Sequence, residues 1–189
     1  MTTSTKPKWL LGAMLAMLMA ATRSHHFATP LALPDASWAV FFLAGAWLGS
    51  ARWLLGLLTL AVAVDAVAIG IAGVPGYCVT PAYSALLVTY SLLWAGGRRI
   101  ARHDAITVAD LGAWAVAVVV AAFVAELCSS GSFYFFGGRF ADPTLQVFIQ
   151  RELAFFPPTL GAMAFYVAAA RVVQVLATEM TRRSGEIHG

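Results

Sequence analysis

Two cysteines are the side chains of this chain best suited to metal or redox chemistry. Cys78 follows Pro75, Gly76 and Tyr77, and Cys128 closes a long apolar run. If an apolar helix begins at Cys78, the helix dipole favours the thiolate, a soft ligand suited to a soft or borderline metal centre. Cys78 is therefore a metal-ligating thiolate, a small buried apolar residue, or half of a disulfide with Cys128. Neither cysteine belongs to a C-x-x-C pair, which argues against a thiol oxidoreductase.

Asp65 is an ionisable residue inside an apolar run that extends from residue 58 to residue 73. A carboxylate within a bilayer costs several kcal/mol unless it is paired or faces water. Two interpretations follow. Asp65 belongs to a functional site, or it forms a hydrogen bond or an ion pair that fixes the packing of helices.

Two further pairs of neighbouring residues are candidates for ligand contacts. His25 and His26 are adjacent, and on a helix their side chains would point about 100° apart, so together they make a poor chelate. One of them contacts a ligand, or both are solvated loop residues. Arg151 and Glu152 form an interfacial ion pair, or Arg151 binds a phosphate or an amide-rich ligand with two parallel hydrogen bonds.

The elements that must position these side chains are membrane-spanning helices. Of the 189 residues, 60% are hydrophobic and only 11% are charged, and the mean hydropathy is +0.79. Soluble globular proteins contain roughly 45–50% apolar and 25% charged residues, so a soluble enzyme, a disordered chain and a nucleic-acid-binding protein are excluded. At about 20 residues per crossing, the chain has room for six crossings.

The apolar runs predict an all-α integral membrane protein with six transmembrane helices in one domain over residues 1–189. The predicted helices cover residues 8–22, 36–50, 53–74, 78–95, 106–128 and 159–177. The first run also fits a signal peptide, but we interpret it as a helix. Residues 129–143 predict a loop or re-entrant stretch, and residues 144–156 an amphipathic segment that Pro157 and Pro158 kink or end.

The distribution of basic residues predicts the orientation. With the N-terminus inside, nine Lys and Arg residues lie on the cytoplasmic side and three on the outer side, which favours both termini inside. The chain has no Walker A glycine loop, so it is not expected to hydrolyse ATP itself. This orientation places the following chemically distinctive residues toward the outer face: His25, His26, Asp65, Tyr77, Cys78, Tyr83, Glu126, Cys128, Tyr134, Arg151 and Glu152.

Small residues form a stripe on the first predicted helix. Gly12, Ala16 and Ala20 recur at intervals of four, so they share one helix face. Such a face lets a second helix approach closely. That second helix belongs to a partner protein or to the same bundle.

Taken together, these features resemble a known family. Six helices in about 190 residues, a small-residue stripe on the first helix and an outward-facing site resemble the substrate-binding S-components of energy-coupling factor (ECF) vitamin transporters. Within that group, the segment from Pro75 to Cys78, with Tyr83, Asp65 and Arg151, resembles the BtuM family of cobalamin transporters. In that family a cysteine near the start of the fourth helix ligates the cobalt of the corrin.

The resemblance implies uptake of cobalamin (vitamin B12), or of the related cobinamide, across a bacterial inner (plasma) membrane. Cys78 is then the axial cobalt ligand, and its thiolate also assists the loss of cyanide from cyanocobalamin. No free metal is expected, and a catalytic role for Cys78 is left open. The other implied ligand-binding residues are Asp65, Tyr77, Tyr83, Arg151 and His26, with the aromatic residues 133–136 beside the corrin.

Three alternatives stay open from the residues. The chain is an S-component for another vitamin such as riboflavin, thiamine or biotin, a thiol-dependent membrane enzyme, or a purely structural membrane subunit. An enzyme needs a second catalytic group near Cys78, for which His26 and Cys128 are the candidates. The energy source is also open: an ECF energizing module docks on Gly12, Ala16 and Ala20, or transport proceeds without one.

Overall fold

The computed structural model describes residues 8–23, 33–76, 79–103 and 107–187. This part of the chain contains helices and no strand, which confirms the all-α prediction. The elements are α1 (Lys8–Arg23), α2 (Ser37–Leu43), the π-helical turn η1 (Ala44–Leu48), α3 (Ala51–Gly70), the short 3-10 helix η2 (Pro81–Ser84), α4 (Ala85–Ile100), α5 (Val108–Phe136) and α6 (Leu145–Ile187).

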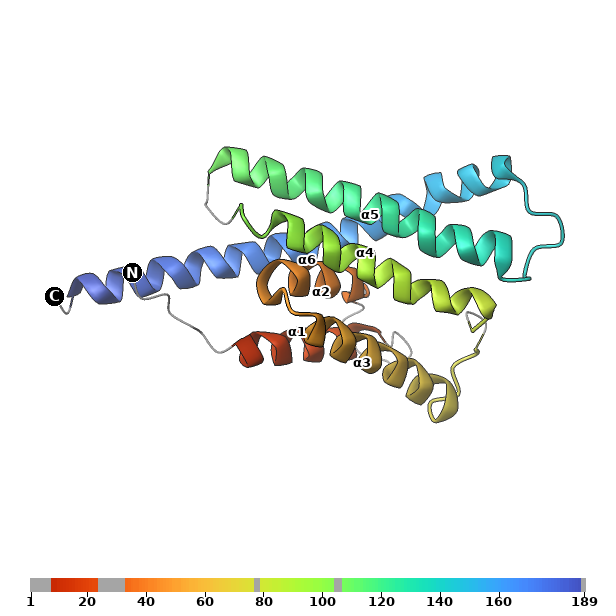
Figure 1. The fold of residues 1–189 in the computed structure, drawn as a ribbon, viewed down its shortest axis with the longest axis horizontal. Coiled ribbons are helices and arrows are strands. Elements are labelled where there is room, and N and C mark those ends of the chain that lie inside the picture. The colour runs from red at the N-terminus through yellow and green to blue at the C-terminus, as the bar shows by residue number, and fades with distance from the viewer. Residues whose placement is uncertain (1–7, 24–32, 77–78, 104–106, 188–189) are drawn as a thin grey trace.

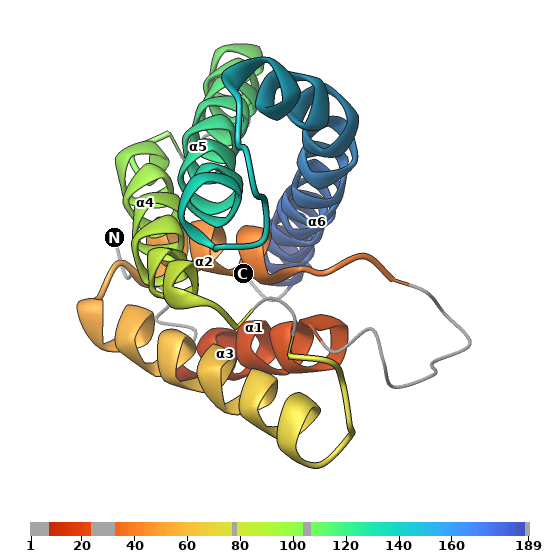
Figure 2. The ribbon, with the colours of Figure 1, turned by 90° about the vertical axis from the view of Figure 1, so that its right-hand side faces the viewer.

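Successive long helices run in opposite directions along the bundle (Figure 1). The ends of α1, α3 and α5 therefore lie at the same end of the molecule as the starts of α2, α4 and α6. We call this the site end; it is on the right in Figure 1. Seen from the site end, α1 and α3 form one layer, and α4, α5 and α6 lie on the other side of α2 (Figure 2).

The short helix α2 is the centre of the core. Phe41 and Phe42 have no exposed surface, and they lie in one apolar cluster with Leu93 of α4, Trp114 of α5 and Met163 of α6. Phe42 also meets Trp114 edge to face, with 5.9 Å between the ring centroids. Burial of these large side chains on every face of α2 explains why a helix of seven residues is stable in this position.

Two glycines allow α4 to lie directly against α2 and η1. A Cβ atom on Gly97 would come within 1.9 Å of the Phe42 carbonyl oxygen, and one on Gly45 within 2.0 Å of the Trp94 carbonyl oxygen. The predicted helix 78–95 was wrong at both ends. Helix α4 begins at Ala85 because Pro81 and its neighbours form η2, and it continues to Ile100 with Gly97 packed closely against Phe42.

The last two helices are longer than predicted. α5 continues to Phe136, so much of the predicted loop 129–143 is helical, and the reversal comes at Gly137 and Gly138, of which Gly138 has a positive φ of 68°. α6 is one helix through Pro157 and Pro158, where separate segments 144–156 and 159–177 were predicted. Neighbouring helices and lipid surroundings commonly keep a helix continuous through proline.

Within the described part of the chain, three helices are long and apolar enough to cross a membrane: Ala51–Gly70, Val108–Phe136 and Leu145–Ser184. Many large apolar side chains on these helices are exposed, for example Phe123 at 51% and Leu153 at 74%. Such continuous apolar surface is stable in lipid and not in water, and with the three helices it indicates a helical membrane protein. α1 and α4 have 16 residues each, about 24 Å of helix, which is shorter than the roughly 30 Å of a bilayer core.

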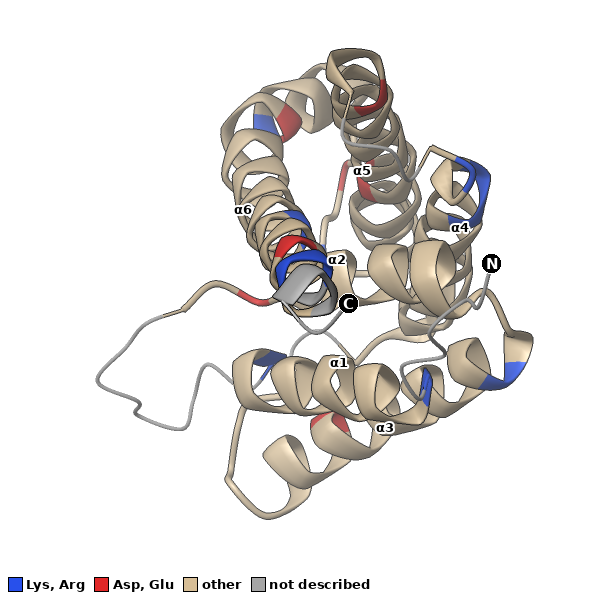
Figure 3. Cartoon of the chain, turned by 90° about the vertical axis from the view of Figure 1, so that its left-hand side faces the viewer, with Lys and Arg blue, Asp and Glu red and all other residues tan. Residues whose placement is uncertain are grey.

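Basic residues gather at the end opposite the site end (Figure 3). Arg52 begins α3, Arg98 and Arg99 lie in the last turn of α4, and Arg182 and Arg183 lie near the end of α6. Arg23 is different, because it ends α1 at the site end.

The small-residue stripe of α1 faces the bundle. Gly12 is buried, and a Cβ atom there would come within 2.1 Å of the indole ring of Trp53 on α3. Ala16 packs partly buried against the core, and Ala20 is also half-buried. The structure therefore supports packing within the bundle for Gly12, the alternative to the docking of a partner.

Candidate functional site

An ion pair joins α1 to α3 at the site end. The Arg23 Nε and Nη2 groups donate to the two carboxylate oxygens of Asp65, each over 2.7 Å. The Arg23 side chain is 7% exposed and that of Asp65 is 24% exposed. Two parallel hydrogen bonds between charged groups form the most specific arrangement available to arginine and a carboxylate. Of the two interpretations of Asp65, the structure shows the ion pair that fixes helix packing.

Two tyrosines extend this contact to η2 and α4. The Tyr83 hydroxyl donates to Asp65 Oδ2 over 2.5 Å, and Arg23 Nη1 donates to the Tyr90 hydroxyl over 2.6 Å. The Tyr90 ring stacks on Phe41 of α2 with 4.3 Å between centroids. The predicted residues Asp65 and Tyr83 are therefore in direct contact, 18 residues apart in the sequence.

The start of α2 completes the network. Arg23 Nη1 also donates to Ser37 Oγ over 3.1 Å, and the Ser37 hydroxyl and backbone N–H donate to Asp35 Oδ1 over 2.6 Å and 2.8 Å. Asp35 thus satisfies a free N–H at the N-terminus of α2. We call these six residues the Arg23 cluster: Arg23, Asp35, Ser37, Asp65, Tyr83 and Tyr90.

The protonation states of the cluster follow from its geometry. Burial, and then the hydrogen bond to Asp65, raise the pKa of Tyr83 to about 12, so Tyr83 is a neutral donor at physiological pH. Arg23 donates hydrogen bonds to Asp65, Tyr90 and Ser37. The guanidinium thus faces a carboxylate and two hydroxyl oxygens, an arrangement that suits its positive charge.

A second group of residues lies at the junction of α5 and α6. The guanidinium of Arg151 lies 4.9 Å from the ring centroid of Phe140, 5.4 Å from that of Phe155 and 5.9 Å from that of Tyr134. Tyr134 is buried and packs against Phe148 at 5.6 Å. Arg151 is thus held on an aromatic platform, a position in which a guanidinium keeps its charge and its donors.

The predicted ion pair between Arg151 and Glu152 does not form. Glu152 instead accepts a hydrogen bond from the Ser130 hydroxyl of α5. This contact fastens the first turns of α6 to the end of α5. Glu126, one turn before Ser130, is buried at 8% exposure and interacts electrostatically with Glu152.

Four of the predicted site residues lie outside the described residues: His25, His26, Tyr77 and Cys78. Cys128 is a free thiol, and its Sγ lies 3.9 Å from the carbonyl oxygen of Ala85, the first residue of α4. The structure therefore places Cys128 beside the start of α4.

No protein-family model matches this chain. A search of curated proteins finds no match either. The resemblance to cobalamin transporters therefore rests on the residues themselves.

Sequence reasoning missed Arg23 as a site residue. The signal was present, because Arg23 is one of only three basic residues placed on the outer side and Asp65 needs a partner at similar depth. Ser37, Tyr90 and Ser130 gave no such signal, since uncharged residues of these types are common in membrane helices.

Proposed function

We propose that this protein binds cobalamin at the site end and carries it across the bacterial inner membrane. In this proposal the chain crosses the membrane six times, with both termini in the cytoplasm and the site end outward. Three of these crossings are made by the shorter helical runs: α1, α2 with η1, and α4. Each of them spans the membrane together with the loop residues that extend it. The gathering of arginines at the opposite end supports this orientation.

The hydrogen bond between Tyr83 and Asp65 is the observation that carries the proposal. It fixes Tyr83 of η2, which lies five residues after Cys78 in the sequence, to α3 and through Arg23 to α1. The chain that leads from Cys78 is thereby anchored at the site end by a charged network. A thiolate must be held in this way to ligate a metal with defined geometry.

The chemistry of cobalamin suits this end of the molecule. Its cobalt is a borderline metal that accepts a thiolate, so Cys78 would replace the benzimidazole base as axial ligand. The thiolate donates an electron pair to cobalt and weakens the bond on the opposite face, so cyanide leaves with its own electron pair and the cobalt remains Co(III). The protein supplies the ligand and no oxidant or reductant is needed.

The other predicted residues take two different roles. Asp65 has both carboxylate oxygens engaged by Arg23 and Tyr83, so we assign it a positioning role and no contact with the corrin. Arg151 lies on its aromatic platform near the start of α6, and we assign it the contact with the phosphate or amides of the ligand. Phe140, a partly exposed ring of the platform, would flank the corrin, and the buried ring of Tyr134 would support the platform.

Isothermal titration calorimetry of the purified protein tests this function. We expect binding of cobalamin, and of cobinamide, because a protein thiolate makes the lower base dispensable. Riboflavin, thiamine and biotin are the matched controls, and binding of one of them without cobalamin would identify an S-component for another vitamin. If no vitamin binds, the proposed function is wrong.

A further inference from the structure

Glu126 of α5 is an acidic residue that the Arg23 cluster does not use. It is 8% exposed, and within the described ranges no hydrogen bond or ion pair reaches its side chain. It lies in a helix long and apolar enough to span a membrane. An ionised carboxylate without a partner in such surroundings is strongly unfavourable.

Glu152 of α6 is the charged neighbour of Glu126. Its carboxylate accepts the hydrogen bond of Ser130, and Ser130 lies one turn after Glu126 on the same face of α5. The carboxyl groups of Glu126 and Glu152 are close enough to interact electrostatically. A proton or a cation is therefore needed to offset the repulsion between them.

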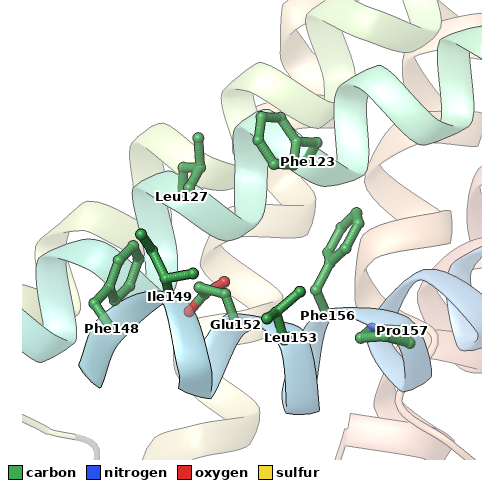
Figure 4. A pocket seen from close by; sticks show the side chains of 8 residues that line it. All are labelled: Phe123, Leu127, Phe148, Ile149, Glu152, Leu153, Phe156 and Pro157. Carbon is green, nitrogen blue, oxygen red and sulfur yellow. The ribbon is translucent and has the colours of Figure 1, made fainter. Parts of the chain in front are cut away.

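Among the described residues, no basic side chain forms an ion pair with Glu126 or contributes to its electrostatic environment. Arg151 lies over the rings of Tyr134, Phe140 and Phe155, and the thiol of Cys128 lies near the Ala85 carbonyl. No other charged group of the described chain interacts with Glu126. Beside Glu152, a pocket of 280 Å³ separates α5 from α6 (Figure 4). Its other lining residues are all apolar: Phe123, Leu127, Phe148, Ile149, Leu153, Phe156 and Pro157.

We propose that Glu126 and Glu152 form a proton-binding site inside the membrane. Glu126 takes a proton from water and becomes the neutral acid, while Glu152 stays ionised and hydrogen-bonded to Ser130. When the proton leaves, the charge of the pair changes by one unit. A site of this kind gives a transporter without a nucleotide-binding loop an ion to couple to, and it does not depend on which ligand is carried.

The first test is infrared difference spectroscopy of the purified protein as a function of pH. The wild-type protein is expected to show the carbonyl band of a protonated carboxylic acid at neutral pH, and Glu126→Gln is expected to remove it. Glu179→Gln is the matched control, because Glu179 is half exposed and paired with Arg182 over 3.3 Å at the far end of α6. Absence of the band in the wild-type protein, or its persistence in Glu126→Gln, would overturn the proposal.

A second variant, Glu152→Gln, tests the proposal independently in case Glu126→Gln does not fold. Glu152→Gln removes the neighbouring negative charge, so Glu126 should release its proton at a lower pH than in the wild-type protein. An unchanged titration midpoint in folded Glu152→Gln would show that the two groups do not act together. In the last experiment, Na⁺ is added at constant pH and the same infrared band is measured. Loss of the band would mean that Na⁺ displaces the proton and that the site binds an inorganic cation. This result would also contradict the proposal.

Discussion

Arg23 and Asp65, 42 residues apart in the sequence, are joined by two parallel hydrogen bonds of 2.7 Å. Arg23 is the last residue of α1, and Asp65 lies near the end of α3. Tyr83 and Tyr90 connect the same pair to η2 and α4. The ion pair and its two tyrosine partners therefore hold four segments together at the site end: α1, α3, η2 and α4.

Substitution of Asp65 should test this role. Asp65→Asn leaves the buried Arg23 charge without its counter-ion, and we expect a loss of about 3 kcal/mol in the free energy of unfolding. Thermal unfolding in detergent measures the change. Thr59→Val on the same helix is the control, because its hydroxyl bonds only to the Leu55 carbonyl of its own helix. An Asp65→Asn protein as stable as the Thr59→Val control would contradict the assigned role.

Tyr83 gives a prediction on pH. Its pKa is raised to about 12 in the folded protein and is near 10 in the unfolded chain, so folding favours the neutral hydroxyl. The contribution of the Tyr83 hydroxyl to the free energy of unfolding is complete below pH 10 and is lost as the pH rises from 10 to 12. The difference in tyrosinate absorbance between the folded wild-type protein and Tyr83→Phe should show a late step near pH 12, because the subtraction removes the steps of the other tyrosines. If Tyr83→Phe changes only a step near pH 10, the hydrogen bond to Asp65 is not made.

Gly12 should be required for the packing of α1 on α3. Gly12→Leu places side-chain atoms where the Trp53 ring lies, and we expect a loss of about 1–3 kcal/mol in stability. Ala21→Leu, on the exposed face of α1, is the control and should unfold at the wild-type temperature. Shortening Trp53 to Ala should restore part of the stability of Gly12→Leu. Normal stability with impaired uptake would instead indicate a partner that docks on the stripe.

Arg151 should contribute to affinity and little to stability. We expect Arg151→Gln to weaken cobalamin binding about 10-fold or more, because a charged hydrogen bond is worth about 1.5–3 kcal/mol. Arg182→Gln, at the opposite end of α6, should bind normally. Calorimetry on both proteins makes the comparison. Equal affinity of Arg151→Gln and wild type would remove Arg151 from the ligand site.

Individual residues show how far sequence reasoning reaches. The apolar run that ends before Arg23 predicted a helix over residues 8–22, and α1 covers Lys8–Arg23, because a long apolar run that ends at a charged residue sets the helix boundary locally. The predicted helix 78–95 ends before Gly97, yet α4 includes this residue, because Gly97 lets α4 approach Phe42, and only the tertiary contact reveals this. Asp65 was singled out correctly as costly in lipid, but its partner Arg23 depends on how α1 and α3 pack.

The ends of α5 and α6 show the same limit. Local composition over residues 129–143 favours a loop, yet Ser130 bonds to Glu152 and Tyr134 packs on Phe148, so α5 continues to Phe136. Such contacts between segments override local preference. The pairing of Glu126 with Glu152 likewise follows from the packing of α5 on α6.

The absorbance spectrum of cobalamin bound to wild-type protein and to Cys78→Ala tests the central claim most directly. The account predicts a base-off corrin with a thiolate ligand in the wild-type protein, and faster loss of cyanide from cyanocobalamin than in buffer. Cys78→Ala and Cys78→Ser should lose both signatures, because alanine has no donor and a serine hydroxyl is a poor ligand for cobalt. Cys128→Ala should keep both. An unchanged cobalt spectrum in Cys78→Ala, or an intact Cys78–Cys128 disulfide in the ligand-bound protein, would contradict the account.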